Sequence, residues 1–276
     1  MADLLDALIL GVVQGLTEFL PISSTGHLIL TEHLLGIPSG KFGLPFDAAI
    51  HLGTLAAVLV YFRDTVSRLI VAWLASLPRL DWRRSPDARL AWLLVLGTIP
   101  AAIAGALIEN TAEKELRDPV LVAAMLLLFC VPLLLAERWG HGSREIADAG
   151  PKDALLLGVA QSIALIPGVS RSGITIATGM LAGLRREEAA AFAFLLSAPV
   201  IAGAGGKQVF DALRGGDSAA GGFDTYAVGL IAAAVVGYAA VAFLMRFLRT
   251  NSLLGFVAYR VVLGVLVLGL AAAGAL

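Results

Sequence analysis

Long apolar stretches, separated by short polar ones, run along the whole chain. A helix needs about 20 apolar residues to cross the hydrocarbon core of a bilayer, and several stretches approach or exceed this length. The pattern therefore predicts an all-α integral membrane protein. The apolar segments are residues 4–35, 45–62, 90–109, 119–136, 153–183, 188–206, 225–247 and 254–275.

Two of these segments differ from the others because helix-breaking residues interrupt them near the middle. The first contains PISSTG from Pro21 to Gly26, and the second contains PGVSRSG from Pro167 to Gly173. Proline lacks a backbone donor, and glycine weakens a helix. Non-helical backbone at membrane depth persists only where protein or a water-filled cavity covers it. We therefore expect two re-entrant helical hairpins and six transmembrane helices.

The two interrupted segments are also copies of each other. Residues 10–27 (LGVVQGLTEFLPISSTGH) and 157–174 (LGVAQSIALIPGVSRSGI) align without a gap. The copies share a glutamine before the interruption, and a serine and a glycine within it. They differ in their charged residues, since Glu18 and His27 occur only in the first copy and Arg171 only in the second. This division suggests one site built from both copies.

Basic residues predict how the chain is oriented in the membrane. Lys and Arg favour cytoplasmic loops. The loop after segment 45–62 holds six arginines between Arg63 and Arg89. With that loop inside, most other basic residues fall on the cytoplasmic side as well, and Arg260 is counted among them. The first hairpin then enters the membrane from outside and the second from inside.

This orientation makes the two halves of the chain inverted-topology repeats. The halves cover residues 1–136 and 153–276, and a polar cytoplasmic linker at 137–152 joins them. We expect a single polytopic membrane domain, 1–276. Transporter folds with inverted repeats place their sites where broken helices meet near the bilayer midplane. The two interruptions are therefore expected to face each other inside the protein.

The composition agrees with a membrane protein. Hydrophobic residues make up 58% of the chain and charged residues 15%, with a mean hydropathy of +0.87, whereas soluble domains carry about 25% charged residues. The net charge of −1 gives no reason to expect a nucleic-acid partner. Cys130 is the one cysteine, so no disulfide framework or thiol metal site is expected. The N-terminus carries Asp3 and Asp6 in place of a basic signal-peptide start, and we interpret it as part of the mature protein.

Polar residues gather around the first interruption. Gln14 and Glu18 are four residues apart and therefore share a helix face. A buried Glu or His within a membrane needs a partner or water, so these residues are candidates for catalysis or ligand binding. The alternative is that Glu18 and His27 pair with each other or cap the broken helix. The other polar positions of the interruption are Ser23, Ser24, Thr25 and Gly26.

The second interruption combines a cation with hydroxyls and glycines. Arg171 lies between Ser170 and Ser172, and its guanidinium offers a fork of donors that suits phosphate. Gly173 lets the backbone approach a ligand, and the helix that follows directs its N-terminal N–H groups to the same place. These features predict an oxyanion or phosphate cradle. The alternative is that Arg171 simply pairs with Glu18.

Other polar residues within apolar segments have less specific signals. Asp47, His51 and Thr54 lie on one segment, where His51 follows Asp47 by four residues, and Gln161 is the copy of Gln14. A structural or supporting role is at least as expected for them as direct participation in a site.

The two interrupted segments resemble the signature motifs of the BacA/UppP family of undecaprenyl pyrophosphate phosphatases. That family has an (E/Q)xxxE motif followed by PxSSTGH, and later PGxSRSGxT. This chain has QGLTE from Gln14 to Glu18, PISSTGH from Pro21 to His27, and PGVSRSGIT from Pro167 to Thr175. Many members have Glu at the first position, where this chain has Gln14, so Glu18 is the stronger candidate for a metal ligand.

The resemblance implies an activity, a substrate and a cofactor. It implies hydrolysis of undecaprenyl pyrophosphate to undecaprenyl phosphate and inorganic phosphate, which recycles the lipid carrier for peptidoglycan synthesis. It further implies bacitracin resistance, a divalent cation such as Mg²⁺ or Ca²⁺, and a multi-pass protein of the bacterial inner membrane. The site is expected to open toward the periplasmic side.

The residues and the resemblance together suggest a mechanism. Arg171 would hold the pyrophosphate, and Glu18, with Gln14 as a tentative second ligand, would hold the cation. Three nucleophiles remain open: Ser24 activated by His27 or Glu18, His27 itself, or a water activated by Glu18. The predicted substrate-binding residues are Ser23, Thr25, Gly26, Ser170, Ser172 and Gly173.

Two further questions stay open from the sequence. Inverted repeats also suit a transporter or flippase of an anionic or lipid-phosphate substrate, and this is the competing function. The polyprenyl tail of a lipid substrate would lie in an apolar groove that opens to membrane lipids. Small-residue faces such as 229–237 permit close helix packing, either within one chain or between the two chains of a homodimer.

Overall fold

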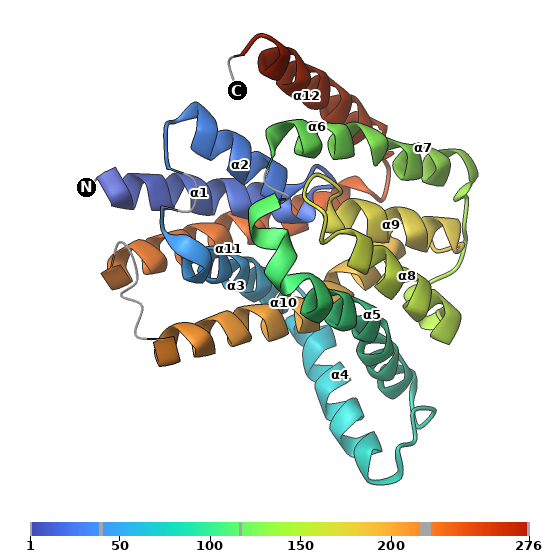
Figure 1. Cartoon of the computed structure of the whole chain (residues 1–276). Helices are drawn as coiled ribbons and strands as arrows, with labels where there is room; N and C mark the ends of the chain where they lie inside the picture. Colours follow the sequence, from blue (N-terminus) through green and yellow to red (C-terminus); the bar gives the residue numbers. More distant parts are fainter. Residues whose placement is uncertain (1, 39–40, 116–117, 216–221, 275–276) are drawn as a thin grey trace.

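The computed structural model describes residues 2–38, 41–115, 118–215 and 222–274, and it consists of helices joined by short loops (Figure 1). The all-α expectation is therefore confirmed for the described residues. The helices are α1 (Ala2–Phe19), α2 (Ser24–Leu34), α3 (Gly43–Tyr61), α4 (Arg63–Ser76), α5 (Pro86–Glu115), α6 (Pro119–Leu128), α7 (Cys130–Trp139), α8 (Pro151–Ile163), α9 (Arg171–Leu181), α10 (Arg186–Gly215), α11 (Gly222–Phe247) and α12 (Leu254–Ala272), with 3₁₀ turns η1 (Leu77–Arg79) and η2 (Ile146–Asp148).

Long apolar helices account for most of the predicted spans. Within the described residues, five helical stretches are long and apolar enough to cross a membrane: Pro86–Leu107, Pro119–Trp139, Arg186–Asp211, Gly222–Phe247 and Leu254–Ala272. The predicted segment 45–62 forms α3, which meets α4 at a bend of 88°. This bent pair would make a sixth span. The membrane character of the chain is thus supported by the helices themselves.

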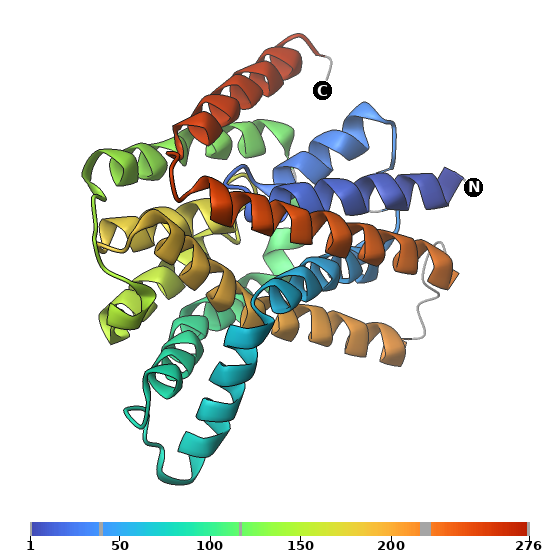
Figure 2. The same cartoon turned by 180° about the vertical axis from the view of Figure 1, so that it is seen from behind.

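The two interrupted segments form two helical hairpins that approach each other from opposite sides of the molecule (Figures 1 and 2). We call residues 20–23, between α1 and α2, the first tip, and residues 164–170, between α8 and α9, the second tip. The tips are in contact. The Gly168 N–H donates to Ser23 Oγ at 3.2 Å, and Ser172 Oγ donates to the Leu20 carbonyl at 3.0 Å.

Each hairpin packs on a helix that belongs to the other half of the sequence. Helix α1 lies on α11, and its counterpart α8 lies on α5. Glycines at matching positions of the repeat permit both contacts. A Cβ on Gly11 would collide with the backbone of Gly229, and a Cβ on Gly158 would collide with the backbone of Gly97. The two halves are therefore interlocked, and this holds the tips at the centre.

The segment predicted as a simple polar linker is tied to the helices around it. Glu137, at its start, accepts from Arg186 at 2.6 Å and from the Leu253 N–H at 2.8 Å. Arg144 donates to the Asp153 carboxylate at 2.7 Å and to the Ala182 carbonyl at 2.6 Å. This network fixes the ends of α7, α8, α10 and α12 relative to one another on the side of the molecule opposite the N-terminus.

Candidate functional site

Both tips have the same unusual backbone at matching serines. Ser23 has φ 73° and ψ 100°, and Ser170 has φ 75° and ψ 109°. A positive φ is rare for a residue with a Cβ and costs about 1–3 kcal/mol, and such strain is typical of functional sites. Each serine accepts from the backbone N–H three residues later, of Gly26 and Gly173 respectively. The repeat in sequence is thus also a repeat in local geometry.

Glu18 is the centre of the polar contacts at the first tip. Its side chain is only 5% exposed. Ser24 Oγ donates to its carboxylate at 2.6 Å, and Gln14 Nε2 donates at 3.0 Å. His51 Nε2 lies 3.8 Å from Glu18 Oε2, and an Arg171 nitrogen lies 3.8 Å from Oε1. An acid thus lies beside a hydroxyl, as in an activated nucleophile.

Arg171 contributes a donor that the protein leaves unused. One terminal nitrogen of its guanidinium is buried and has no hydrogen-bond partner. This nitrogen lies 3.8 Å from Glu18, which is within ion-pair range but too long for a hydrogen bond. The ion pair between Arg171 and Glu18, which was the predicted alternative, therefore explains why the two residues lie close together. This ion pair still leaves a donor of Arg171 available for a ligand.

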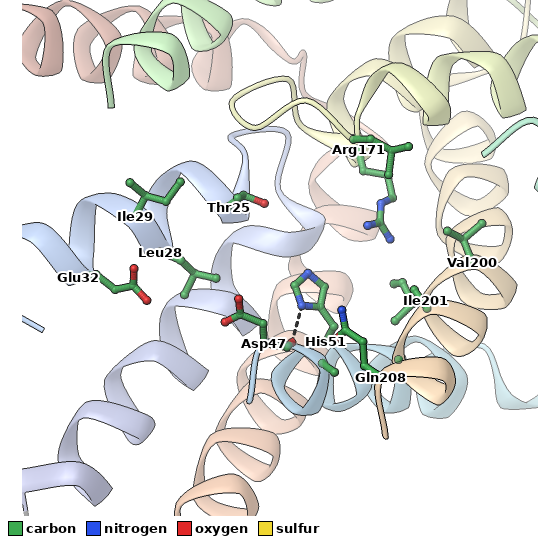
Figure 3. A pocket seen from close by; sticks show the side chains of 14 residues that line it. Thr25, Leu28, Ile29, Glu32, Asp47, His51, Arg171, Val200, Ile201 and Gln208 are labelled. Atoms are coloured by element: carbon green, nitrogen blue, oxygen red, sulfur yellow. Dashed lines mark hydrogen bonds between the residues drawn. The ribbon is translucent and has the colours of Figure 1, made fainter. Parts of the chain in front are cut away.

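These side chains surround two adjoining cavities, the larger of which is drawn in Figure 3. A small one, of about 30 Å³, lies between the tips, and we call it the crevice; its polar lining is Glu18, Ser23, Ser24, Thr25, His51, Ser170 and Arg171. A larger one, of about 270 Å³, has Glu32, Asp47 and Gln208 in its lining. Thr25, His51 and Arg171 line both cavities. Figure 3 shows Arg171 and His51 pointing toward the same space.

The structure does not bring His27 together with Glu18 and Ser24. Its Nδ1 is bonded to the Ser23 carbonyl at 2.7 Å, and its Nε2 is bonded to the Tyr259 hydroxyl at 2.7 Å. Both ring nitrogens are therefore engaged on the α12 side of the first tip. Its predicted catalytic role stays a prediction.

His51 is the histidine that faces the cavities. Its Nδ1 is bonded to the Asp47 carbonyl at 2.7 Å, and because a carbonyl can only accept, Nδ1 carries the proton. Nε2 is then the nitrogen near Glu18. From the sequence, a structural or supporting role was at least as expected for His51 as direct participation, and its one signal was a polar residue within an apolar segment. Thr54 donates to the His51 carbonyl within the same helix.

The remaining predicted residues shape the tips. Ser172 Oγ lies 3.2 Å from Ser170 Oγ within the second hairpin, and its bond to the Leu20 carbonyl joins that hairpin to the first tip. Thr25 is the hydroxyl that faces both cavities. Gln161, the counterpart of Gln14, has a buried amide with no hydrogen-bond partner for either polar atom.

One residue of the site was assigned elsewhere from the sequence. Arg260 was counted among cytoplasmic charges, but its side chain is fully buried behind the two tips. It donates to the carbonyls of Pro21 and Val169. The prediction was wrong because an arginine near the polar start of an apolar helix usually extends to the membrane surface, whereas here the fold places it at the centre.

The site has few groups that could hold a metal ion. Among the described residues, no cluster of three or more His, Cys, Asp or Glu side chains is suitably placed. Gln14 Oε1 is buried without a hydrogen-bond partner beside Glu18. One carboxylate and one amide oxygen fit a hard cation that takes its other ligands from water and from a bound phosphate, which is how Mg²⁺ commonly binds.

Comparisons with known proteins agree with the two motifs. The chain matches the family described as "Bacitracin resistance protein BacA" over residues 7–266. It is 48% identical to an undecaprenyl-diphosphatase of Rubrobacter xylanophilus, over 98% of this chain and 99% of that protein. It is 46% identical to one of Kineococcus radiotolerans, over 97% and 93%. It is 44% identical to one of Thermobifida fusca, over 99% and 92%. The chain therefore belongs to the BacA family of bacitracin resistance proteins.

Proposed function

We propose that the protein hydrolyses undecaprenyl pyrophosphate to undecaprenyl phosphate and inorganic phosphate. The observation that carries the proposal is the pairing of Ser24 Oγ with Glu18 at 2.6 Å, next to an Arg171 donor without a partner. A nucleophile, its base and an anion-binding group thus line one crevice. The relatives named above are undecaprenyl-diphosphatases, which supports the enzyme over the transporter.

The chemistry follows from these contacts. Arg171 binds the terminal phosphate and neutralises part of its charge, which is the main contribution of a protein to phosphoryl transfer. Ser24 Oγ attacks the terminal phosphorus while Glu18 takes its proton, and the bond to the bridging oxygen breaks to release undecaprenyl phosphate. Glu18 passes the Ser24 proton to the departing undecaprenyl phosphate and is a free carboxylate again. It then takes a proton from a water that attacks the phosphorus of phosphorylated Ser24, and it returns this proton to Ser24 Oγ as inorganic phosphate is released.

Water attacking directly is the alternative to Ser24. A volume of about 30 Å³ holds about two waters, so the crevice has room for either nucleophile. Acid quenching during turnover, followed by mass spectrometry of the peptide that contains Ser24, distinguishes them. A phosphorylated Ser24 supports the serine. An unmodified peptide, together with an active Ser24→Ala variant, supports the water.

A divalent cation fits this scheme through the oxygen atoms of Glu18 and Gln14. When bound, Mg²⁺ or Ca²⁺ would supply further charge neutralisation at the diphosphate. Because one carboxylate and one amide hold such an ion weakly, we propose that it binds together with the substrate.

The lipid tail of the substrate has a path along the contact between α3 and α10. His51 of α3 and Ile201 of α10 line the larger cavity, and one turn away on the same two helices Leu55 and Ala198 line an apolar groove of about 310 Å³. Trp73 also lines this groove. We propose that the terminal phosphate enters the crevice, that the rest of the diphosphate and the first isoprene units occupy the larger cavity, and that the tail leaves along this groove.

We also propose how the chain lies in the inner membrane. Six spans, with α3 and α4 as the bent one, surround two re-entrant hairpins of inverted topology. The arginine-rich α4–α5 turn lies on the cytoplasmic side. The larger cavity, lined by residues of α2, α3 and α10 near the N-terminal side, then opens toward the periplasm.

The test is phosphate release by the purified, folded protein. With undecaprenyl pyrophosphate as substrate, Glu18→Gln and Ser24→Ala should each lose nearly all activity. Ser67→Ala is the matched control, because Ser67 is an exposed serine that bonds only within its helix. Assays in proteoliposomes distinguish the phosphatase from the competing transporter. Lipid or anion exchange without phosphate release would establish a transporter and refute the phosphatase.

A further inference from the structure

Helix α12 carries a guanidinium, that of Arg260, which contacts the backbone of both tips. Arg260 is 0% exposed. A buried arginine ordinarily pairs with a carboxylate, but this one donates to backbone carbonyls at 3.0–3.4 Å. These carbonyls belong to Pro21 of the first tip, Gly168 and Val169 of the second tip, and Met125 and Leu126 at the end of α6.

The three tip carbonyls, of Pro21, Gly168 and Val169, need a partner because they lie where helices are broken. A backbone oxygen without a hydrogen bond costs several kcal/mol in a membrane interior. Since a peptide group is planar, holding the Val169 carbonyl also fixes the direction of the Ser170 N–H. In the same way, the bond to the Pro21 carbonyl fixes the direction of the Ile22 N–H. Arg260 thus sets the backbone just before Ser23 and Ser170, the two serines with positive φ.

The neighbouring residue, Tyr259, holds the first tip through His27. The Ser23 carbonyl can only accept, so His27 Nδ1 carries a proton, and in the neutral ring Nε2 accepts from the Tyr259 hydroxyl. The two rings also stack, with centroids 5.6 Å apart and planes inclined by 10°. The chain of contacts runs from Tyr259 through His27 to the Ser23 backbone.

We propose that Tyr259 and Arg260 are positioning residues for the reaction, and that His27 belongs with them. The proposal rests on the proposed function. Tyr259, Arg260 and His27 are not among the described residues that line the crevice or the larger cavity. They therefore act on the reaction through the tips. Arg260 sets both tips, whereas Tyr259 sets only the first. A variant of Arg260 should therefore disturb both tips, and a variant of Tyr259 should disturb only the first.

The experiment combines kinetics with hydrogen–deuterium exchange on the full chain in lipid nanodiscs. Arg260→Lys keeps the charge but offers at most three donors. It should lower kcat roughly 10- to 100-fold, change KM less than about threefold because Arg171 is intact, and speed exchange in residues 20–27 and 167–174. Tyr259→Phe keeps the ring and loses one hydrogen bond. It should lower kcat roughly 2- to 10-fold and speed exchange in 20–27 alone.

Arg249→Lys, at an exposed position, is the control and should change neither readout. A slower Arg260→Lys enzyme whose tips exchange at the wild-type rate would overturn the proposal. So would a Tyr259→Phe variant that alters both tips or neither. If Arg260→Lys fails to fold, Tyr259→Phe decides alone. A wild-type protein that releases no phosphate refutes the proposed function instead, and the exchange pattern still tests what holds the tips.

Discussion

Arg171 offers the sharpest test of how the site binds phosphate. Its buried terminal nitrogen has no partner, so the whole strength of a bond to phosphate is available. A hydrogen bond between charged groups contributes about 1.5–3 kcal/mol, and a fork of two contributes about 3–6 kcal/mol. At 1.36 kcal/mol for each factor of ten, Arg171→Ala should lower kcat/KM by about 10²- to 10⁴-fold.

The alanine variant also removes a charge next to Glu18. The two groups are 3.8 Å apart, and at an effective dielectric constant near 20 their attraction is about 4 kcal/mol. Arg171→Lys separates the two effects because it keeps a charge near Glu18 and loses the planar fork. The loss of one bond predicts a decrease of about 10- to 100-fold in kcat/KM for the lysine variant.

The assay is phosphate release over a range of polyprenyl diphosphate concentrations, together with inhibition by inorganic phosphate. Both variants should bind phosphate more weakly, in the order wild type, lysine, alanine. Arg185→Lys is the control, because Arg185 is 41% exposed and pairs with Glu145 and Glu188 away from the tips. An alanine variant within about threefold of wild type would refute the phosphate clamp. A lysine variant equal to wild type would show that only charge matters.

Three further predictions concern the surroundings of the site. His51→Ala should lower kcat/KM about tenfold, because Nε2 faces the crevice 3.8 Å from Glu18 and the variant removes the one hydrogen bond that this nitrogen can form in the substrate complex; unchanged kinetics would exclude His51 from the site. Gly11→Ala should destabilise the protein by about 1–3 kcal/mol in denaturant titrations, because its Cβ would collide with Gly229. Gly206→Ala, where the space is open, should be neutral or slightly stabilising. An equal loss of stability in the two variants would contradict the close packing of Gly11 on Gly229. A chelator should lower phosphate release at least about tenfold, and added Mg²⁺ should restore it; full activity in chelator would exclude the cation.

The sequence was sufficient to predict that Glu18 and Arg171 lie close together. The repeat marked the two interruptions, and the asymmetry of basic residues oriented them, so their meeting needed no knowledge of side-chain packing. The structure places the two residues in ion-pair range. The family indicated by the motifs is confirmed as well.

The roles of the histidines could not be predicted in the same way. His27 follows Ser23 by four residues, so its ring can bond to the carbonyl of its own first turn, and contact with α12 decides that it does. His51 lies on α3, outside the repeat that revealed the tips. Which face of a helix meets the site depends on tertiary packing, and an apolar segment that is buried all round gives no periodic signal for it.

The contact between Arg260 and Pro21 has a consequence for how the protein is made. The two residues are 239 positions apart in the chain. At a synthesis rate of about 5–20 residues per second, the first tip waits roughly 12–48 s before the arginine that supports it is translated. Helix α11, on which α1 packs, is also synthesised late. A chain that stops before α12 would carry every motif residue but not the guanidinium that donates to the carbonyls of both tips, so the site is complete only once the last helix has been made.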